Sequence, residues 1–395
     1  MVKKYDVVIA GGGPSGLSAA AKAASMGCSV LVMEMQSQIG GQGQAAWVGG
    51  GIWKAVPASL LSRIREVTLR CTGESLTVRG NFGVVLDRRT FDRGLALRAA
   101  DAGADIWLSS PVRDLLFSDG RVVGVKSGLG SWAEEVRADV VIDATGSRGE
   151  WSCLFMRRVA QRELSREEIS FSSEYLVAKC GEKAVNLVFS SYLTPGGHGW
   201  VYPCGNGMAA VGVHGVRINP ELALDEFIGR DSVRGLKGSV PVAAFRSQFP
   251  LIGPLDRAHG AGIVAVGGAA GQIYQLSPRG LEHAVRAGEI AGEAAAEAVS
   301  SRETSEEGLS GYEQAWREKL YGDLRIGKML RNSLSTFQDR KMSSIISAAR
   351  DEPKLARALV DVFLCRNLGR SVRSLLRSER ISRALGVNSV EGLLD

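Results

Sequence analysis

The stretch Tyr5–Met35, YDVVIAGGGPSGLSAAAKAASMGCSVLVMEM, decides the fold. Its apolar run Val7–Ala10 stops at three consecutive glycines, and Pro14 then opens an alanine-rich pattern that is typical of a helix. That pattern ends at Gly27, which suits a left-handed helix cap, and a second apolar run covers Ser29–Met33. The stretch therefore predicts a strand–turn–helix–strand unit.

The turn of this unit has the G-x-G-x-x-G spacing, and each glycine has a physical reason. Gly11 permits a tight exit from the strand, Gly13 lets a pyrophosphate approach the backbone, and Gly16 lets helix and strand pack closely. Glu34 follows the second strand, where a carboxylate accepts hydrogen bonds from ribose hydroxyls and repels a 2′-phosphate. A glycine-rich turn that binds nothing is the alternative. Strand, helix, cap and acid together favour a dinucleotide site.

Length and composition place the chain among soluble globular proteins. Its 395 residues allow two or three domains, and 45% of them are hydrophobic and 23% charged. The six cysteines contain no C-x-x-C pair, so we expect reduced thiols, no disulfide framework and no metal site. With no signal peptide and no apolar run of membrane-spanning length, we expect a cytoplasmic protein.

The remaining patterns predict an α/β fold, in which a Rossmann-like domain carries an inserted, mostly antiparallel β-sheet domain and a C-terminal helical region. The predicted elements are a helix at 60–70, a strand and helix at 84–103, strands at 104–137 with a hairpin at Asp119-Gly120, a buried strand at 140–147, antiparallel strands at 169–217, a helix at 220–229, a strand at 263–271 and a helix at 281–299. We expect a discontinuous first domain at 1–165 and 255–300, a second domain at 166–254 and helices at 301–395.

Three separated segments together resemble the flavoprotein family that includes p-hydroxybenzoate hydroxylase. They are the opening unit, the turn Ala144-Thr145-Gly146, and the strand–glycine–helix pattern at 263–281. The resemblance implies FAD as the cofactor. The segment RRTFD, which begins at Arg88, is similar to a motif of this family whose arginine reaches the FAD pyrophosphate. The alternative is that Arg88 is a solvated surface arginine.

Within that family the chain most resembles the geranylgeranyl reductases. PGGHGWVYP at Pro195–Pro203 is similar to their P-x-x-Y-x-W-x-F-P lipid-site motif, and GGAAGQIYQLSPRGL at Gly267–Leu281 is similar to their flavin loop. GYEQAWREKL at 311–320 is similar to their C-terminal region. The sequence departs from the family at Gly268, where the loop aspartate is absent, and at His198, which replaces the motif tyrosine. These departures bear on the substrate more than on FAD.

The resemblance also implies the residues of the site. The expected cofactor-binding residues are Gly11, Gly13, Pro14, Ser15, Gly16, Glu34, Met35, Gln42, Arg88, Val112, Ala144, Thr145, Gly146, Gly268, Arg279, Gly280 and Leu281. Arg279 either lies near the pyrimidine end of the flavin, where it would raise the reduction potential, or points to solvent. Trp200 and Tyr202 face the same side of a strand and are substrate-binding candidates, although core positions are equally consistent. His198 is either a proton donor or a loop histidine bonded to backbone.

The expected reaction is hydride transfer from reduced FAD to a carbon–carbon double bond of an isoprenoid lipid. No second G-x-G-x-x-G opens a helix after a strand, so we expect a separate electron donor, such as a ferredoxin-like protein or a reduced deazaflavin or nicotinamide carrier. Two alternatives stay open: a flavin hydroxylase or halogenase-like enzyme acting on an aromatic molecule, and a flavin-free lipid-binding or interaction module. We expect no nucleic-acid partner and no metal.

Arginines recur every three or four residues near the end of the chain. Arg366, Arg370, Arg373, Arg377, Arg380 and Arg383 would share one stripe of a helix. Such a stripe either contacts an anionic membrane peripherally or is the solvated face of a packed helix.

Overall fold

The strand–turn–helix unit lies at the centre of the first sheet in the computed structural model, which describes residues 3–40, 45–128, 134–147, 151–230, 233–277, 280–335 and 339–385. The strand order is β17 (His259–Gly260), β18 (Ile263–Ala265), β11 (Glu134–Asp143), β1 (Lys3–Ala10), β2 (Val30–Met33) and β8 (Asp105–Trp107), with β9 (Val112–Ser118) and β10 (Arg121–Ser127) joined through β11. β18, β11, β1, β2 and β8 are parallel neighbours. The loops that follow these strands therefore meet at one edge.

The helix cap and the hairpin turn that the sequence predicts in this region are confirmed. Gly27 has a φ of 93° just after α1 (Pro14–Ser25), as a left-handed cap requires. Asp119 and Gly120 have φ of 49° and 77° between β9 and β10, which is the backbone of a two-residue hairpin.

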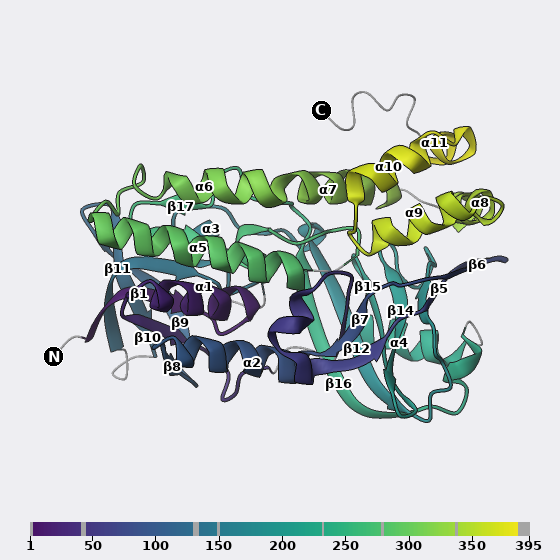
Figure 1. Cartoon of the computed structure of the whole chain (residues 1–395), viewed down its shortest axis with the longest axis horizontal. Helices are drawn as coiled ribbons and strands as arrows, with labels where there is room; N and C mark the ends of the chain where they lie inside the picture. Colours follow the sequence, from purple (N-terminus) through teal and green to yellow (C-terminus); the bar gives the residue numbers. More distant parts are fainter. Residues whose placement is uncertain are drawn as a thin grey trace.

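Helices cover the first sheet, and two of them pack with unusually close backbones. α1 lies against α5 (Leu281–Ser301), and α2 (Arg88–Asp101) lies on the other side of α1 (Figure 1). A Cβ on Gly292 of α5 would overlap the Ala19 carbonyl oxygen of α1. Glycine at this position therefore sets the distance between the two helices.

The second sheet is mostly antiparallel, as the sequence predicts. Its order is β16 (Val240–Pro250), β12 (Ile169–Ala178), β15 (Met208–Gly215), β14 (His198–Gly205), β13 (Val185–Val188), β5 (Glu66–Cys71) and β6 (Glu74–Arg79). Only the β13–β5 pair is parallel within the described strands. α4 (Pro220–Gly229) packs on β12 and β15, and a small sheet of β3 (Ala45–Val48), β7 (Val84–Asp87) and β4 (Leu60–Arg63) lies between the two large ones.

The predicted helix at 60–70 is wrong. This segment forms β4 and the first part of β5, and Val67 and Leu69 are buried in the core of the second sheet. The β-branched and apolar residues of β5 gain more from pairing with β6 and β13 than a local helical pattern offers. The predicted domain boundaries stay a proposal. β5 and β6 fall within the predicted first domain, 1–165, yet they belong to the second sheet, where β5 pairs with β13 and β6.

The C-terminal region is helical, as predicted; its first helix lies along α5, and its later helices pack on the second sheet (Figure 1). Its elements are α6 (Ser310–Trp316), a π-helical turn (Arg317–Tyr321), α7 (Gly322–Ser335), α8 (Asp339–Arg350), α9 (Pro353–Phe363), α10 (Leu368–Leu376) and α11 (Glu379–Leu385). Phe363, Leu368 and Val372 share one buried cluster with Val67 and Trp200. The tail is thus part of the core.

The predicted single arginine stripe needs correction because the helix is interrupted. Arg366 precedes α10, carries an ion pair to Asp361 and donates to the Asn81 carbonyl oxygen at 3.1 Å. Arg380 and Arg383 belong to α11, a separate helix. Cys365 and Asn367 have left-handed backbone, with φ of 51° and 49°, and this conformation interrupts the helix before α10.

Substituting Gly292 tests the close packing of α1 and α5. Gly292→Ala should lower the free energy of unfolding by about 1–3 kcal/mol, because its methyl group overlaps the Ala19 carbonyl oxygen. Urea unfolding followed by circular dichroism measures the change. Gly311→Ala in α6 is the matched control, since open space surrounds its new Cβ and helix propensity improves. Equal stability of the two variants would contradict this account.

Candidate functional site

A large cavity opens where the carboxyl edge of the first sheet meets the second sheet. Its walls come from the turn after β1, the start of α5, strands β14 and β16, and the turn after α9. Of the sequence-predicted residues, those that line it are Gly11, Gly13, Pro14, Ser15, Glu34, Met35, Arg88, Val112, Ala144, Thr145, Gly146, Trp200, Tyr202, Gly268, Gly280 and Leu281. Gln42 and Arg279 lie outside the described residues, and their predicted roles stay predictions.

The turn after β1 has the shape of a phosphate cradle. A Cβ on Gly11 would overlap the Ala144 carbonyl oxygen, and one on Gly16 would overlap the Gly11 carbonyl oxygen. Gly16 is therefore a packing residue beneath the cavity wall. At Gly13, by contrast, no atom of the described residues lies within 4 Å of an added Cβ. Backbone faces open space there, next to the N-terminus of α1, which is the arrangement that accepts a pyrophosphate.

Glu34 is held rigidly at the end of β2. Its side chain is buried, and its carboxylate accepts from the Gly12 N–H at 2.7 Å and from the Gln36 N–H at 2.8 Å. Each carboxylate oxygen accepts more than one hydrogen bond, so Glu34 retains capacity for a ligand hydroxyl in the cavity. The geometry fits the predicted ribose contact.

Arg88 brings a positive charge to the same cavity from the start of α2. Its guanidinium forms an ion pair with Asp92 at 3.0 Å, and Nε donates to the same carboxylate at 3.2 Å. Burial opposes the charged guanidinium, but the Asp92 carboxylate outweighs it and raises the pKa of Arg88. Arg88 is therefore a fixed, oriented cation and not a solvated surface arginine.

An aromatic wall from the second sheet closes the cavity opposite the glycine turn. Trp200 and Tyr202 stack with ring centroids 5.9 Å apart and an interplanar angle of 24°, so they share one face of β14 as predicted. The Trp200 indole donates to Glu174 at 3.1 Å, which fixes its orientation. Phe245 and Phe249 of β16 also line the cavity. The sequence analysis missed these two, although their spacing of four residues along a strand would place both on one face.

His198 lies outside this cavity. It lines a second, smaller cavity with residues that include Phe189, Gly197 and Arg331. Its imidazole Nδ1 lies 3.0 Å from His214 Nε2, and both rings are buried. Burial, with a smaller contribution from Arg331, lowers the pKa of His214 to about 3. The proton-donor role of His198 stays a prediction, and the structure provides a histidine partner where a backbone partner was the alternative.

The start of α5 and the turn after α9 supply wall residues that the sequence did not indicate. Glu282 accepts from the Gly50 N–H and so ties α5 to the segment after β3. His283, Leu364 and Cys365 complete this side. These positions belong to no motif, and they lie far apart in the chain, so no local spacing could have brought them together.

Comparison with known proteins gives the class of the protein. A family model of FAD dependent oxidoreductases matches residues 6–148. A geranylgeranyl bacteriochlorophyll reductase-like protein of Thermoplasma acidophilum shares the fold, with a TM-score of 0.83, 23% identity and coverage of 98% of this chain and 99% of that one. A flavin-dependent brominase shares it at a TM-score of 0.71 and 17% identity, over 92% and 94% of the two chains. Fold and cavity together define an FAD-dependent oxidoreductase.

Curated relatives give the family. A digeranylgeranylglycerophospholipid reductase of Methanopyrus kandleri is 31% identical over 377 residues, which cover 90% of this chain and 97% of the relative. A second, from Methanothermobacter thermautotrophicus, is 32% identical over 366 residues, with coverage of 87% and 91%. The chain belongs to the digeranylgeranylglycerophospholipid reductase family. None of the described helices is both long and apolar enough to cross a bilayer.

Gly13→Val tests the phosphate cradle. The valine side chain would occupy the open space in front of the turn without displacing a described protein atom, so the protein should fold but lose bound flavin. Flavin absorbance of the purified protein, read beside its circular dichroism spectrum, measures this. Gly229→Ala, at the end of α4, should remain fully yellow, because no atom of the described residues lies within 4 Å of its added Cβ. Stoichiometric flavin in Gly13→Val would show that the cradle is elsewhere.

Proposed function

We propose that this chain hydrogenates carbon–carbon double bonds in the geranylgeranyl chains of a glycerophospholipid. The observation that carries the proposal is one cavity with two unlike walls. A glycine turn and a helix N-terminus form the first wall, and stacked aromatic rings form the second. Family membership supplies the substrate class, since the relatives are named digeranylgeranylglycerophospholipid reductases.

The first wall fits FAD, and we assign its parts accordingly. The turn from Gly11 to Ser15 receives the pyrophosphate, Glu34 receives the adenosine ribose, and Arg88 balances phosphate charge. The turns Ala144–Gly146 and Gly267–Ala270, together with Gly280 and Leu281 at the start of α5, lie along the remaining edge of the cavity and would contact the rest of the cofactor. Bound FAD, once reduced, supplies the hydride for the reaction.

The second wall suits an isoprenoid chain. Trp200, Tyr202, Phe245 and Phe249 present aromatic surface, and the polar edge of Trp200 is already bonded to Glu174. Such a wall excludes water and binds an apolar chain by burial of its surface. Ser172, Glu174 and Ser247 also line this side, so the preference for a lipid reductase over a hydroxylase rests on the names of the relatives.

The electron donor is proposed to be a separate carrier. The sequence contains a single strand-to-helix G-x-G-x-x-G turn, and the present proposal assigns that turn to FAD. A ferredoxin-like protein or a reduced deazaflavin or nicotinamide carrier would then reduce the flavin from outside.

Lipid reduction by the flavin-loaded protein tests the function. The chemically reduced protein should add pairs of hydrogens to geranylgeranyl chains of a glycerophospholipid, seen as two-hydrogen mass increments by mass spectrometry. Phe245→Glu should lower this turnover at least about tenfold while FAD remains bound, because an apolar chain bound against this half-buried position would have to desolvate the carboxylate. The exposed Phe117→Glu is the matched control and should retain turnover. The proposal fails if no increments form, or if both variants behave alike.

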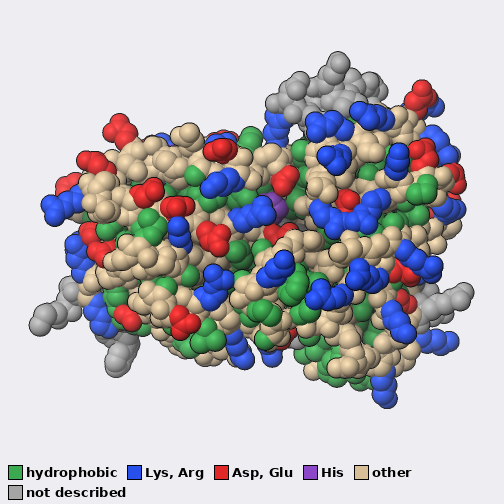
Figure 2. Space-filling view, in the orientation of Figure 1, with side chains coloured by type: hydrophobic (Ala, Val, Ile, Leu, Met, Phe, Trp, Pro, Cys, Tyr) green, Lys and Arg blue, Asp and Glu red, His purple; other side chains and the backbone are tan. Residues whose placement is uncertain are grey.

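We also propose that the C-terminal helices contact an anionic membrane surface peripherally. Lys and Arg side chains gather over this part of the molecule (Figure 2), and Arg370, Arg373, Arg377 and Arg380 are exposed. A substrate embedded in a bilayer requires such an approach. Each basic residue close to anionic lipid contributes about 1 kcal/mol.

Charge substitution tests this contact better than deletion, because removing the tail would also remove buried Leu368 and Val372. The Gln variant of Arg370, Arg373, Arg377 and Arg380 should bind anionic vesicles at least about tenfold more weakly in flotation, given the energy per residue. A control with the same change in net charge replaces the exposed Arg65, Arg98, Arg137 and Arg302 by Gln. Equal losses in the two proteins would leave net charge as the only cause and refute a specific contact surface.

A further inference from the structure

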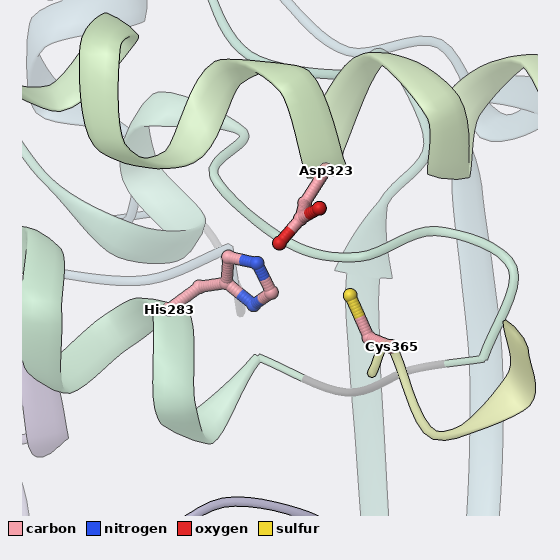
Figure 3. Close-up of side chains that lie close together, drawn as sticks. All are labelled: His283, Asp323 and Cys365. Atoms are coloured by element: carbon pink, nitrogen blue, oxygen red, sulfur yellow. The ribbon is translucent and has the colours of Figure 1, made fainter. Parts of the chain in front are cut away.

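Three side chains of metal-binding types meet beside the cavity, although they lie far apart in the sequence. His283 comes from the first turn of α5, Asp323 from the first turn of α7, and Cys365 from the turn between α9 and α10. They point toward one another (Figure 3), and a ring nitrogen, a carboxylate oxygen and the thiol sulfur all lie within 4.8 Å of each other. His283 and Cys365 also line the cavity, so the cluster lies at its wall.

Two members of the cluster are polar groups whose hydrogen-bonding capacity is unused. His283 is 7% exposed, and neither its imidazole nor the Asp323 carboxylate has a hydrogen bond or an ion pair within the described part of the chain. His283 is buried and Asp323 is half-buried, and their converging, unbonded polar atoms point to a shared ligand that both side chains can bind, such as a metal ion.

The donor set indicates which ion would fit. A thiolate, a carboxylate and a neutral imidazole carry two negative charges, which a divalent cation neutralises. Calcium and magnesium take oxygen ligands, whereas a mixed sulfur, nitrogen and oxygen set is typical of zinc. Zinc bonds of roughly 2.0–2.3 Å place ligand atoms somewhat closer together than the present separation, a difference that small side-chain rotations remove.

We propose that His283, Asp323 and Cys365 bind one zinc ion at the wall of the cavity. Three protein ligands leave the fourth position of a tetrahedral site open, and the exposure of two ligands to the cavity directs that position toward it. Arg286 acts electrostatically on His283 and Asp323, but its single positive charge is outweighed by the two negative charges of a carboxylate and a thiolate. The ion would join the start of α5 to α7 and to the turn after α9. This assignment goes beyond the proposed function and holds for any substrate.

Metal analysis of the full-length, flavin-loaded protein tests the site. After incubation with zinc chloride and desalting, the wild-type protein should retain one zinc per chain by elemental mass spectrometry. Cys365→Ser and Asp323→Asn should each weaken zinc binding by at least about tenfold, since each removes a direct ligand. Asp323→Asn keeps the size of the side chain, and circular dichroism spectra and melting temperatures that match the wild type, all measured in the metal-free form, will show that both variants fold.

Cobalt substitution provides a second readout that does not depend on turnover. Cobalt in a tetrahedral site with a thiolate ligand should absorb in the red, where oxidised flavin does not, and Cys365→Ser should lose this absorption. Cys28→Ser is the matched control, because Cys28 is also partly buried but lies outside the cluster. The site is refuted if wild-type protein retains no zinc, or if Cys365→Ser and Asp323→Asn bind zinc and cobalt as tightly as Cys28→Ser does.

Discussion

Backbone that approaches backbone without intervening side chains is the constraint on which the cavity depends. β1, α1, β11 and α5 meet at glycines, where an added Cβ on Gly11, Gly16 or Gly288 would overlap a neighbouring carbonyl oxygen. Because the backbones are in direct contact at these glycines, the N-terminus of α1 is fixed relative to the loops after β2 and β11. The position of Glu34 and the Ala144–Gly146 turn follows from this packing, as does the place where phosphates would bind.

The sequence predicts the backbone structure of this half of the cavity well because its information is local. Val7–Ala10, the glycine turn, Gly27 and Glu34 all lie within one strand–turn–helix–strand unit, and their physical roles follow from spacing alone. The Asp119-Gly120 hairpin is predicted for the same reason, since two positive φ angles suffice to define it. Local rules of this kind need no knowledge of the rest of the chain.

The opposite half of the site depends on contacts between distant segments, and there the sequence falls short. β5 pairs with β13, more than one hundred residues later, and that pairing overrides the helical prediction for 60–70. His198, Trp200 and Tyr202 lie on one strand, and spacing places them on one face, but it does not reveal that the face extends across two cavities. Leu364 and Cys365 reach the wall because the helix is interrupted at residues with left-handed backbone. No hydrophobic periodicity predicts this interruption.

The turn between α9 and α10 has a consequence for the folding of the protein during its synthesis on the ribosome. Leu364 and Cys365 are synthesised more than three hundred residues after the glycine turn, yet both segments border the same cavity. A chain synthesised only as far as α5 contains the glycine turn but lacks the residues that form this wall. The cavity therefore remains open to water until the last helices have emerged, and tight retention of the cofactor becomes a property of the finished chain.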